Sequence, residues 1–123
     1  MSSEITIDAV RLALGMQEMQ ARVASTNIAN ANRPGAQALR VNFSALQQSL
    51  GDIASGSGSG DMASELLDAE AALQSAGPIV SGLPINLDQE VGSMVIAGTR
   101  YQALGEALSR QFGLMRLAIS GRS

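Results

Sequence analysis

The sequence predicts an all-α protein in which two long helices, one at each end of the chain, pair as an antiparallel coiled coil. A short, irregular and partly helical middle segment joins them. Apolar residues recur at alternating spacings of three and four over residues 6–31 and again over 87–119, as in a coiled-coil seam. Between these stretches Pro, Gly and Ser repeatedly interrupt the pattern. A length of 123 residues suits one domain.

Residues 6–31 are expected to form the first helix, with Thr6 as its N-cap. One apolar stripe consists of Ile7, Val10, Leu14, Ala21, Ala24 and Ile28, with Gln17 as a polar exception. A second stripe consists of Ile5, Ala9, Leu12, Met16, Met19 and Val23. At about 100° per residue the two stripes lie on nearly opposite sides, so this helix is expected to be apolar on two faces.

The segment that follows is expected to be a joint at which the helix ends. Asn27, Asn30 and Asn32 stand there, and short amide side chains can bind unpaired backbone groups and tolerate left-handed backbone conformations. Pro34 then prevents the helix from continuing. Residues 1–35 therefore make up a first region of helix and Asn/Pro-Gly joint.

Residues 36–85 form a variable middle region. Short helices are possible around 43–50 and 62–75, the second started by Asp61. The Ser-Gly run at 55–60 reads as a flexible linker. Because this region is rich in Gly and Ser, it is expected to be partly mobile and to bury little apolar surface.

A second long helix is expected over 87–119, within a third region that spans 86–123. Asn86 is its predicted N-cap, with Gln89 completing an Asn-x-x-Gln capping box. Its main apolar stripe consists of Met94, Ala97, Tyr101, Leu104, Leu108, Phe112, Met115 and Ile119. Ile96, Ala103, Ala107, Leu114 and Ala118 recur on another side. Regions 1–35 and 86–123 together are expected to form one helical core domain.

Two helices that pair through one face each leave their second stripes exposed. Large exposed apolar patches usually mark association surfaces, so the pattern predicts a subunit that is partly unfolded alone and completes its burial beside neighbours. The alternative is an ordinary bundle in which the middle helices cover the spare stripes. The Gly and Ser content of the middle region weighs against that alternative.

The composition argues against several other functions. Cys, His and Lys are all absent, which removes thiolate, imidazole and Schiff-base chemistry, and no enzyme, cofactor or metal site is expected. The acids Asp61, Glu65 and Asp68 read as a solvated helix face. A net charge of −3 disfavours nucleic acid. The polar strips carry mixed charge, which disfavours a membrane-surface helix. Neither a cleaved signal nor a membrane-spanning stretch is evident.

Two parts of the chain resemble a known family. The segment S-T-N-I-A-N-A-N-R-P-G at 25–35 resembles the Asn-Ile-Ala-Asn-x-x-x-Pro-Gly signature of the bacterial flagellar axial proteins, which are the rod, hook and hook-associated subunits. The stretches at 86–91, 100–104 and 108–119 resemble more narrowly the FlgB type of proximal rod protein. Together with the two-faced helices, these motifs identify the chain as a member of this family.

The chain departs from the family signature at two positions of the joint. Arg33 stands where Thr usually precedes Pro-Gly, and Ala36 stands where an aromatic residue commonly follows Gly. These departures affect the expected local packing of the joint rather than the resemblance.

The resemblance implies a structural subunit of the proximal rod in the flagellar basal body, a shaft that transmits torque from the membrane ring to the hook. It implies export to the periplasm by the flagellar type III apparatus without a cleaved signal. The implied partners are copies of itself, other rod proteins, the ring-to-rod adaptor and the membrane ring protein. The alternative is a cytoplasmic helical adaptor or secretion chaperone, which would form a closed dimer and remain inside the cell.

The candidate interface and packing residues come from the two helices and the joint. In the N-terminal region they are Leu12, Met16, Met19, Val23, Asn27, Ile28, Asn30, Pro34 and Gly35. In the C-terminal region they are Met94, Ile96, Tyr101, Leu104, Ala107, Leu108, Phe112, Leu114 and Met115.

Overall fold

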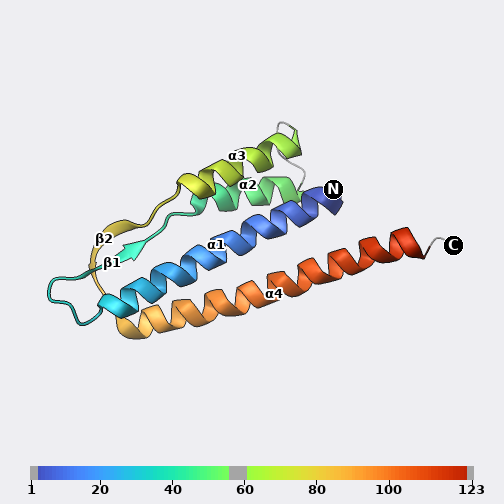
Figure 1. The fold of residues 1–123 in the computed structure, drawn as a ribbon. Coiled ribbons are helices and arrows are strands. Elements are labelled where there is room, and N and C mark those ends of the chain that lie inside the picture. The colour runs from blue at the N-terminus through green and yellow to red at the C-terminus, as the bar shows by residue number, and fades with distance from the viewer. Residues whose placement is uncertain (1–2, 56–60, 122–123) are drawn as a thin grey trace.

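The computed structural model describes residues 3–55 and 61–121, and most of these are helical (Figure 1). The order of elements is α1 (Ser3–Asn30), β1 (Gln37–Arg40), α2 (Ser44–Ser55), α3 (Met62–Ser75), β2 (Ile79–Pro84) and α4 (Leu87–Ser120). The two long terminal helices pack together, as the apolar spacing predicts. The pair of strands was not predicted.

The molecule has three helical layers, with α1 between α4 on one side and the α2–α3 hairpin on the other (Figure 1). The two long helices run in opposite directions. Ala24, near the end of α1, lines the same cleft as Glu90 at the start of α4. Arg11, nearer the start of α1, lies over the ring of Phe112, whose centroid is 5.9 Å from the guanidinium carbon.

Helix α1 begins earlier than the sequence predicts. It starts at Ser3, so Thr6 lies inside the helix and is not its N-cap. The additional turn places Ile5 against the core formed with α2 and α3, and this burial favours helix over a cap at Thr6. The far end is close to expectation, since α1 ends at Asn30.

The second apolar stripe of α1 is covered inside the subunit, contrary to the prediction. Leu12 and Met16 form a core cluster with Leu46 and Ile53 of α2 and Leu66 of α3. The Gly- and Ser-rich composition of the middle region is therefore a poor guide to its burial. Its apolar residues fall at spacings of three, four and seven, which collect them on one side of each short helix.

Close approach of α3 to α1 occurs at Gly15, in the middle of α1. A Cβ atom built at this glycine would lie 2.8 Å from Leu73 Cδ2, closer than an ordinary contact. Glycine weakens a helix interior by about 1 kcal/mol relative to Ala, so its use here is explained by the packing of Leu73. The predicted linker at 55–60 lies outside the described residues except for Ser55.

The caps predicted for the later helices are confirmed. Asn86 Oδ1 accepts a hydrogen bond from Gln89 N at 3.2 Å at the start of α4. Asp61 Oδ1 accepts one from Ala63 N at 3.2 Å at the start of α3. Both cap residues are extended, as N-cap residues usually are.

Strands β1 and β2 pair antiparallel, with Leu39 opposite Val80 and Arg40 opposite Ile79. The middle region is partly helical as predicted, but it also contains this pair of strands, which the sequence did not indicate. Gly35, with φ of +73°, lies in the turn that leads from α1 into β1, and β-branched residues begin β2. The sheet places residues 37–40 beside the end of α1.

Candidate functional site

Asn27 fastens strand β1 to helix α1. Its side chain is 1% exposed, its Nδ2 donates to the carbonyl oxygen of Leu39 at 3.1 Å, and its Oδ1 accepts from Leu39 N at 2.8 Å. One amide side chain thus pairs with a strand backbone as a neighbouring strand would. The sequence indicated that Asn27 binds backbone groups, but it placed those groups at the helix end, whereas they belong to β1.

Asn30 acts within the joint as predicted. Its Nδ2 donates to Thr26 O in the last helical turn at 3.0 Å, and its Oδ1 accepts from Arg33 Nη1 at 3.2 Å. Arg33, one of the two departures from the family signature, therefore contributes to the joint. The residue with positive φ is Gly35 rather than an asparagine. Pro34 and Gly35 are both exposed.

Glu90, which the sequence did not single out, is buried where α4 meets β1. It is 1% exposed, and Arg40 Nη1 lies 2.7 Å from its Oε1 as an ion pair with angles outside those of a hydrogen bond. Arg40 Nη1 also donates to Leu39 O at 2.9 Å. This carbonyl therefore receives donors from both Asn27 and Arg40. The sequence signal that could have identified Glu90 is its position seven residues before Ala97, which places both residues on the same side of α4.

One line of residues on α4 faces α1. Glu90 and Ala97 are each 1% exposed, and Leu104, Leu108 and Met115 continue this side of the helix as half-buried residues. The predicted main stripe was thus partly right. Met94, Tyr101, Phe112 and Ile119 were assigned to it, but their exposures of 38%, 44%, 38% and 78% place them at the margin of the contact or outside it, and Phe112 at this margin meets Arg11 of α1.

Apolar residues remain exposed on both sides of this contact line. We define the Ile96 flank as Ile96, Ala103, Ala107, Leu114 and Ala118, which are all exposed, with Ile96 at 52% and Leu114 at 61%. We define the Tyr101 flank as Leu87, Val91, Met94, Tyr101 and Phe112, all likewise exposed. Side chains of this size and number on one helix are typical of an association surface.

The N-terminal candidates are not available for a comparable surface. Leu12, Met16 and Val23 are buried within the subunit, and Met19 and Ile28 are half-buried. The prediction that a second stripe of the first helix serves as an outer contact is therefore wrong. The α2–α3 hairpin covers the N-terminal part of this stripe, and Met19 and Val23 at its other end lie near Leu39 of β1. The exposed apolar flanks lie on α4.

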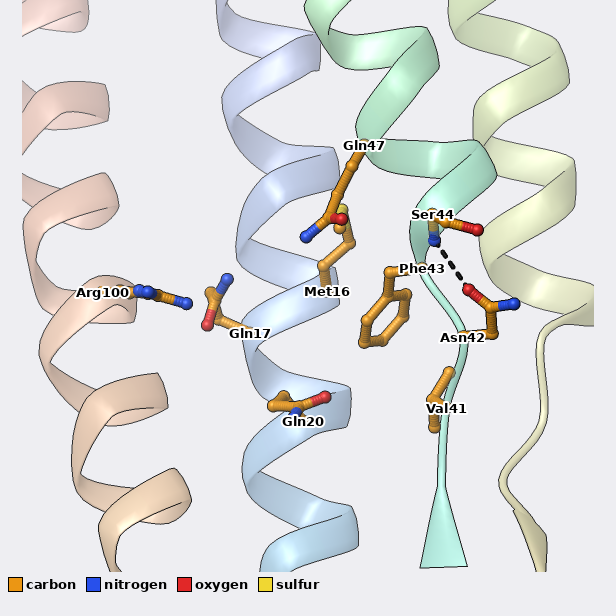
Figure 2. A pocket seen from close by; sticks show the side chains of 9 residues that line it. All are labelled: Met16, Gln17, Gln20, Val41, Asn42, Phe43, Ser44, Gln47 and Arg100. Carbon is orange, nitrogen blue, oxygen red and sulfur yellow. Dashed lines mark hydrogen bonds between the residues drawn. The ribbon is translucent and has the colours of Figure 1, made fainter. Parts of the chain in front are cut away.

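A polar cleft of about 300 Å³ opens between α1, the segment that leads from β1 into α2, and Arg100 of α4 (Figure 2). Gln17, Gln20 and Gln47 contribute amides. Figure 2 shows Asn42 bonded to the backbone nitrogen of Ser44 at the start of α2, a distance of 2.9 Å. The cleft can offer hydrogen bonds and one positive charge to a polar group.

Further comparisons add no assignment. In residues 3–55 and 61–121, no group of three or more carboxylate, imidazole or thiol side chains converges as metal ligands, and no helix is long and apolar enough to span a membrane. Comparison with protein-family models, curated proteins and solved structures finds no significant match. The function must therefore be inferred from the residues and geometry of the chain.

Proposed function

We propose that this protein is a structural subunit of the proximal rod of the bacterial flagellum, of the FlgB type. The observation that carries the proposal is the pair of exposed apolar flanks on α4, which leave burial incomplete in a single subunit. The resemblance of residues 25–35 and of the C-terminal stretches to flagellar axial proteins supplies the identity of the assembly.

The pairing of α1 with α4 is proposed to be an antiparallel coiled coil. The spacing of Ala97, Leu104, Leu108 and Met115 by seven, four and seven residues supports this geometry on α4. Ala24 and Ala97, exposed by 2% and 1%, are small residues in buried positions and allow the two backbones to approach closely. A paired rod of this kind resists bending better than a single helix.

In the proposed assembly, α4 makes the contacts between subunits. It is 34 residues long, or about 51 Å at 1.5 Å per residue, and its C-terminal end extends past the start of α1 (Figure 1). If the Ile96 flank of one subunit meets a different surface of the next, the contact is heterologous and need not close into a ring. Repetition of such a contact produces a helical filament.

The proposed partners are copies of the chain, other rod proteins, the ring-to-rod adaptor and the membrane ring protein. The proposed location is the periplasmic basal body, reached through the flagellar type III apparatus. The test is to purify basal bodies, with and without the hook, and to probe them for this protein. Its presence in both preparations is expected. Its absence from both would contradict the proposal.

A cytoplasmic helical adaptor or secretion chaperone is the second candidate, because it too would expose apolar flanks before it binds. This alternative requires the protein to stay in the cell and to bury its α4 flanks in a closed dimer. Cell fractionation separates the two candidates, since a rod subunit is recovered with the envelope and a chaperone with the cytoplasm.

A further inference from the structure

The two strands differ in the availability of their outer edges. The outer edge of β1 is occupied at Leu39, whose backbone N–H and C=O both bind the side chain of Asn27. Asn27 therefore closes this edge to any other strand. Edges of sheets that remain open can pair with further chains, and blocking an edge is a common protection against such pairing.

The geometry of the ladder shows which groups of β2 face outward. In an antiparallel pair of strands, the N–H and C=O of any one residue point to the same side of its strand. Along the ladder, a pair of opposed residues that exchange two hydrogen bonds alternates with a pair whose N–H and C=O groups point away from the partner strand. Since the N–H and C=O of Leu39 point to Asn27, the Leu39–Val80 pair is of the second kind. The N–H and C=O of Val80 therefore point toward the outer edge of β2.

The surroundings of this edge are open and apolar. Strand β1 is the element that β2 packs against, and the other side of β2 faces outward (Figure 1). Ile79, Val80 and Leu83 are 63%, 61% and 63% exposed. No charged residue occurs from Ala71 to Leu87, so the charges that usually discourage edge pairing are missing there.

We propose that β2 pairs edge to edge with β2 of a second copy of this chain, across a two-fold axis at Val80. The N–H of each Val80 donates to the C=O of the same residue in the other copy, and the product is a four-stranded sheet in the order β1-β2-β2-β1. A residue with both groups directed outward is self-complementary under a two-fold rotation. A second copy offers no other open strand edge within the described residues, because Asn27 closes β1.

This contact goes beyond the proposed rod function and does not depend on it. It uses β2, whereas the proposed filament contact uses α4. Pro78 and Pro84 stand at the two ends of the strand and lack an N–H, so they restrict the pairing to a short length. A short contact of this kind suits a reversible dimer of the unassembled subunit.

A single cysteine tests the register, because the natural chain contains none. Opposed residues that exchange both hydrogen bonds have Cα atoms about 5.5 Å apart, within the range that a disulfide spans. Under mild oxidation Val80→Cys is expected to form a disulfide-linked dimer at least about tenfold faster than Leu67→Cys. Leu67 is 65% exposed on α3 and is a matched control for accessibility. Equal rates would overturn the proposal.

Charge substitution tests the contact at equilibrium by analytical ultracentrifugation. Val80→Lys and Val80→Asp each place like charges opposite one another and are expected to weaken the dimer at least about tenfold, whereas an equimolar mixture restores it. Leu67→Lys is expected to dimerise like the unaltered chain.

The proposal fails if the unaltered chain stays monomeric up to about 1 mM. The proposal also fails if the Val80→Lys variant dimerises as well as the unaltered chain does. It fails likewise if Ala107→Glu disrupts the dimer and Val80→Lys does not. Helical circular dichroism confirms that each variant is folded.

Discussion

At the scale of single residues, the two buried polar side chains of Asn27 and Glu90 connect strand β1 to the two long helices. Asn27 extends from α1 to β1, and Arg40 of β1 forms an ion pair with Glu90 of α4. The side chains of Asn27 and Arg40 both donate to the carbonyl oxygen of Leu39. Buried polar groups are costly unless they are paired, so each of these residues matters mainly through the partner that it satisfies. Three elements that are distant in the sequence thereby meet at one backbone position.

Asn27→Ala is expected to lower the free energy of unfolding by about 2 kcal/mol, because the N–H of Leu39 loses its partner and the C=O of Leu39 keeps only the donor from Arg40. Urea denaturation followed by circular dichroism measures this change. Asn30→Ala is the matched control, since the hydrogen bonds of Asn30 are exposed, and its expected loss is below about 1 kcal/mol. Equal losses in the two variants would show that Asn27 has no special role.

Arg40→Ala is expected to destabilise the protein more than Glu90→Gln does. The first change leaves a buried carboxylate without its partner, at a cost of about 3 kcal/mol, whereas the second retains the volume of the side chain and removes the buried charge. The double variant is expected to lose less than the sum of the two single losses. Additive losses in the urea titrations would mean that the two side chains do not interact.

At the scale of elements, the helix pair and the hairpin have different tasks. The α2–α3 hairpin covers one face of α1 and supplies the internal core, while α4 covers the other face and carries the exposed flanks. The contact between α1 and α3 requires a position without a side chain, since Leu73 lies where a Cβ at residue 15 would be.

Gly15→Val is expected to lower the free energy of unfolding by about 1 to 3 kcal/mol, because the added methyl groups displace Leu73 in a packed layer. In a Leu73→Ala background the same change is expected to cost much less, since the space is then available. Thermal unfolding of the four chains gives the coupling energy. An unchanged cost in the Leu73→Ala background would show that the helix interior, rather than the α3 contact, requires glycine.

At the scale of the whole molecule, the exposed flanks of α4 connect the fold to the proposed assembly. A subunit that must join a filament has to remain folded well enough to present one continuous surface. The internal core under the α2–α3 hairpin makes this possible without neighbours. The sequence pattern predicts instead a subunit that is partly unfolded alone and completes its order on assembly.

Ala107→Glu, or Leu114→Glu, is expected to block motility while the subunit is still exported, because a charge on the Ile96 flank opposes burial against a neighbour. Swimming in soft agar and the amount of exported subunit are the two measurements. Gln102→Glu adds the same charge at an exposed polar position of α4 and is expected to swim normally. Normal swimming of the flank variants would remove the Ile96 flank from the proposed interface.

The existence of all four helices, the approximate bounds of α1, α3 and α4, and the caps at Asp61 and Asn86 could be predicted because they depend on local spacing and local hydrogen bonds. Helix α2 continues to Ser55, five residues past its predicted end. Half of the predicted main stripe of α4 was also right. The strands could not be predicted in this way, since β1 depends on Asn27 and on β2, which is about forty residues further along the chain.

The sequence by itself therefore determined a helical protein with two long terminal helices and apolar residues on two faces of each. Only the tertiary structure decided which of those faces remain open: the hairpin covers α1, and the flanks of α4 stay exposed. The tertiary structure also buries Glu90 and directs the side-chain hydrogen bonds of Asn27 to the backbone of strand β1. Spacing along a helix shows which side chains share a face, but whether that face meets protein or water depends on segments distant in the sequence.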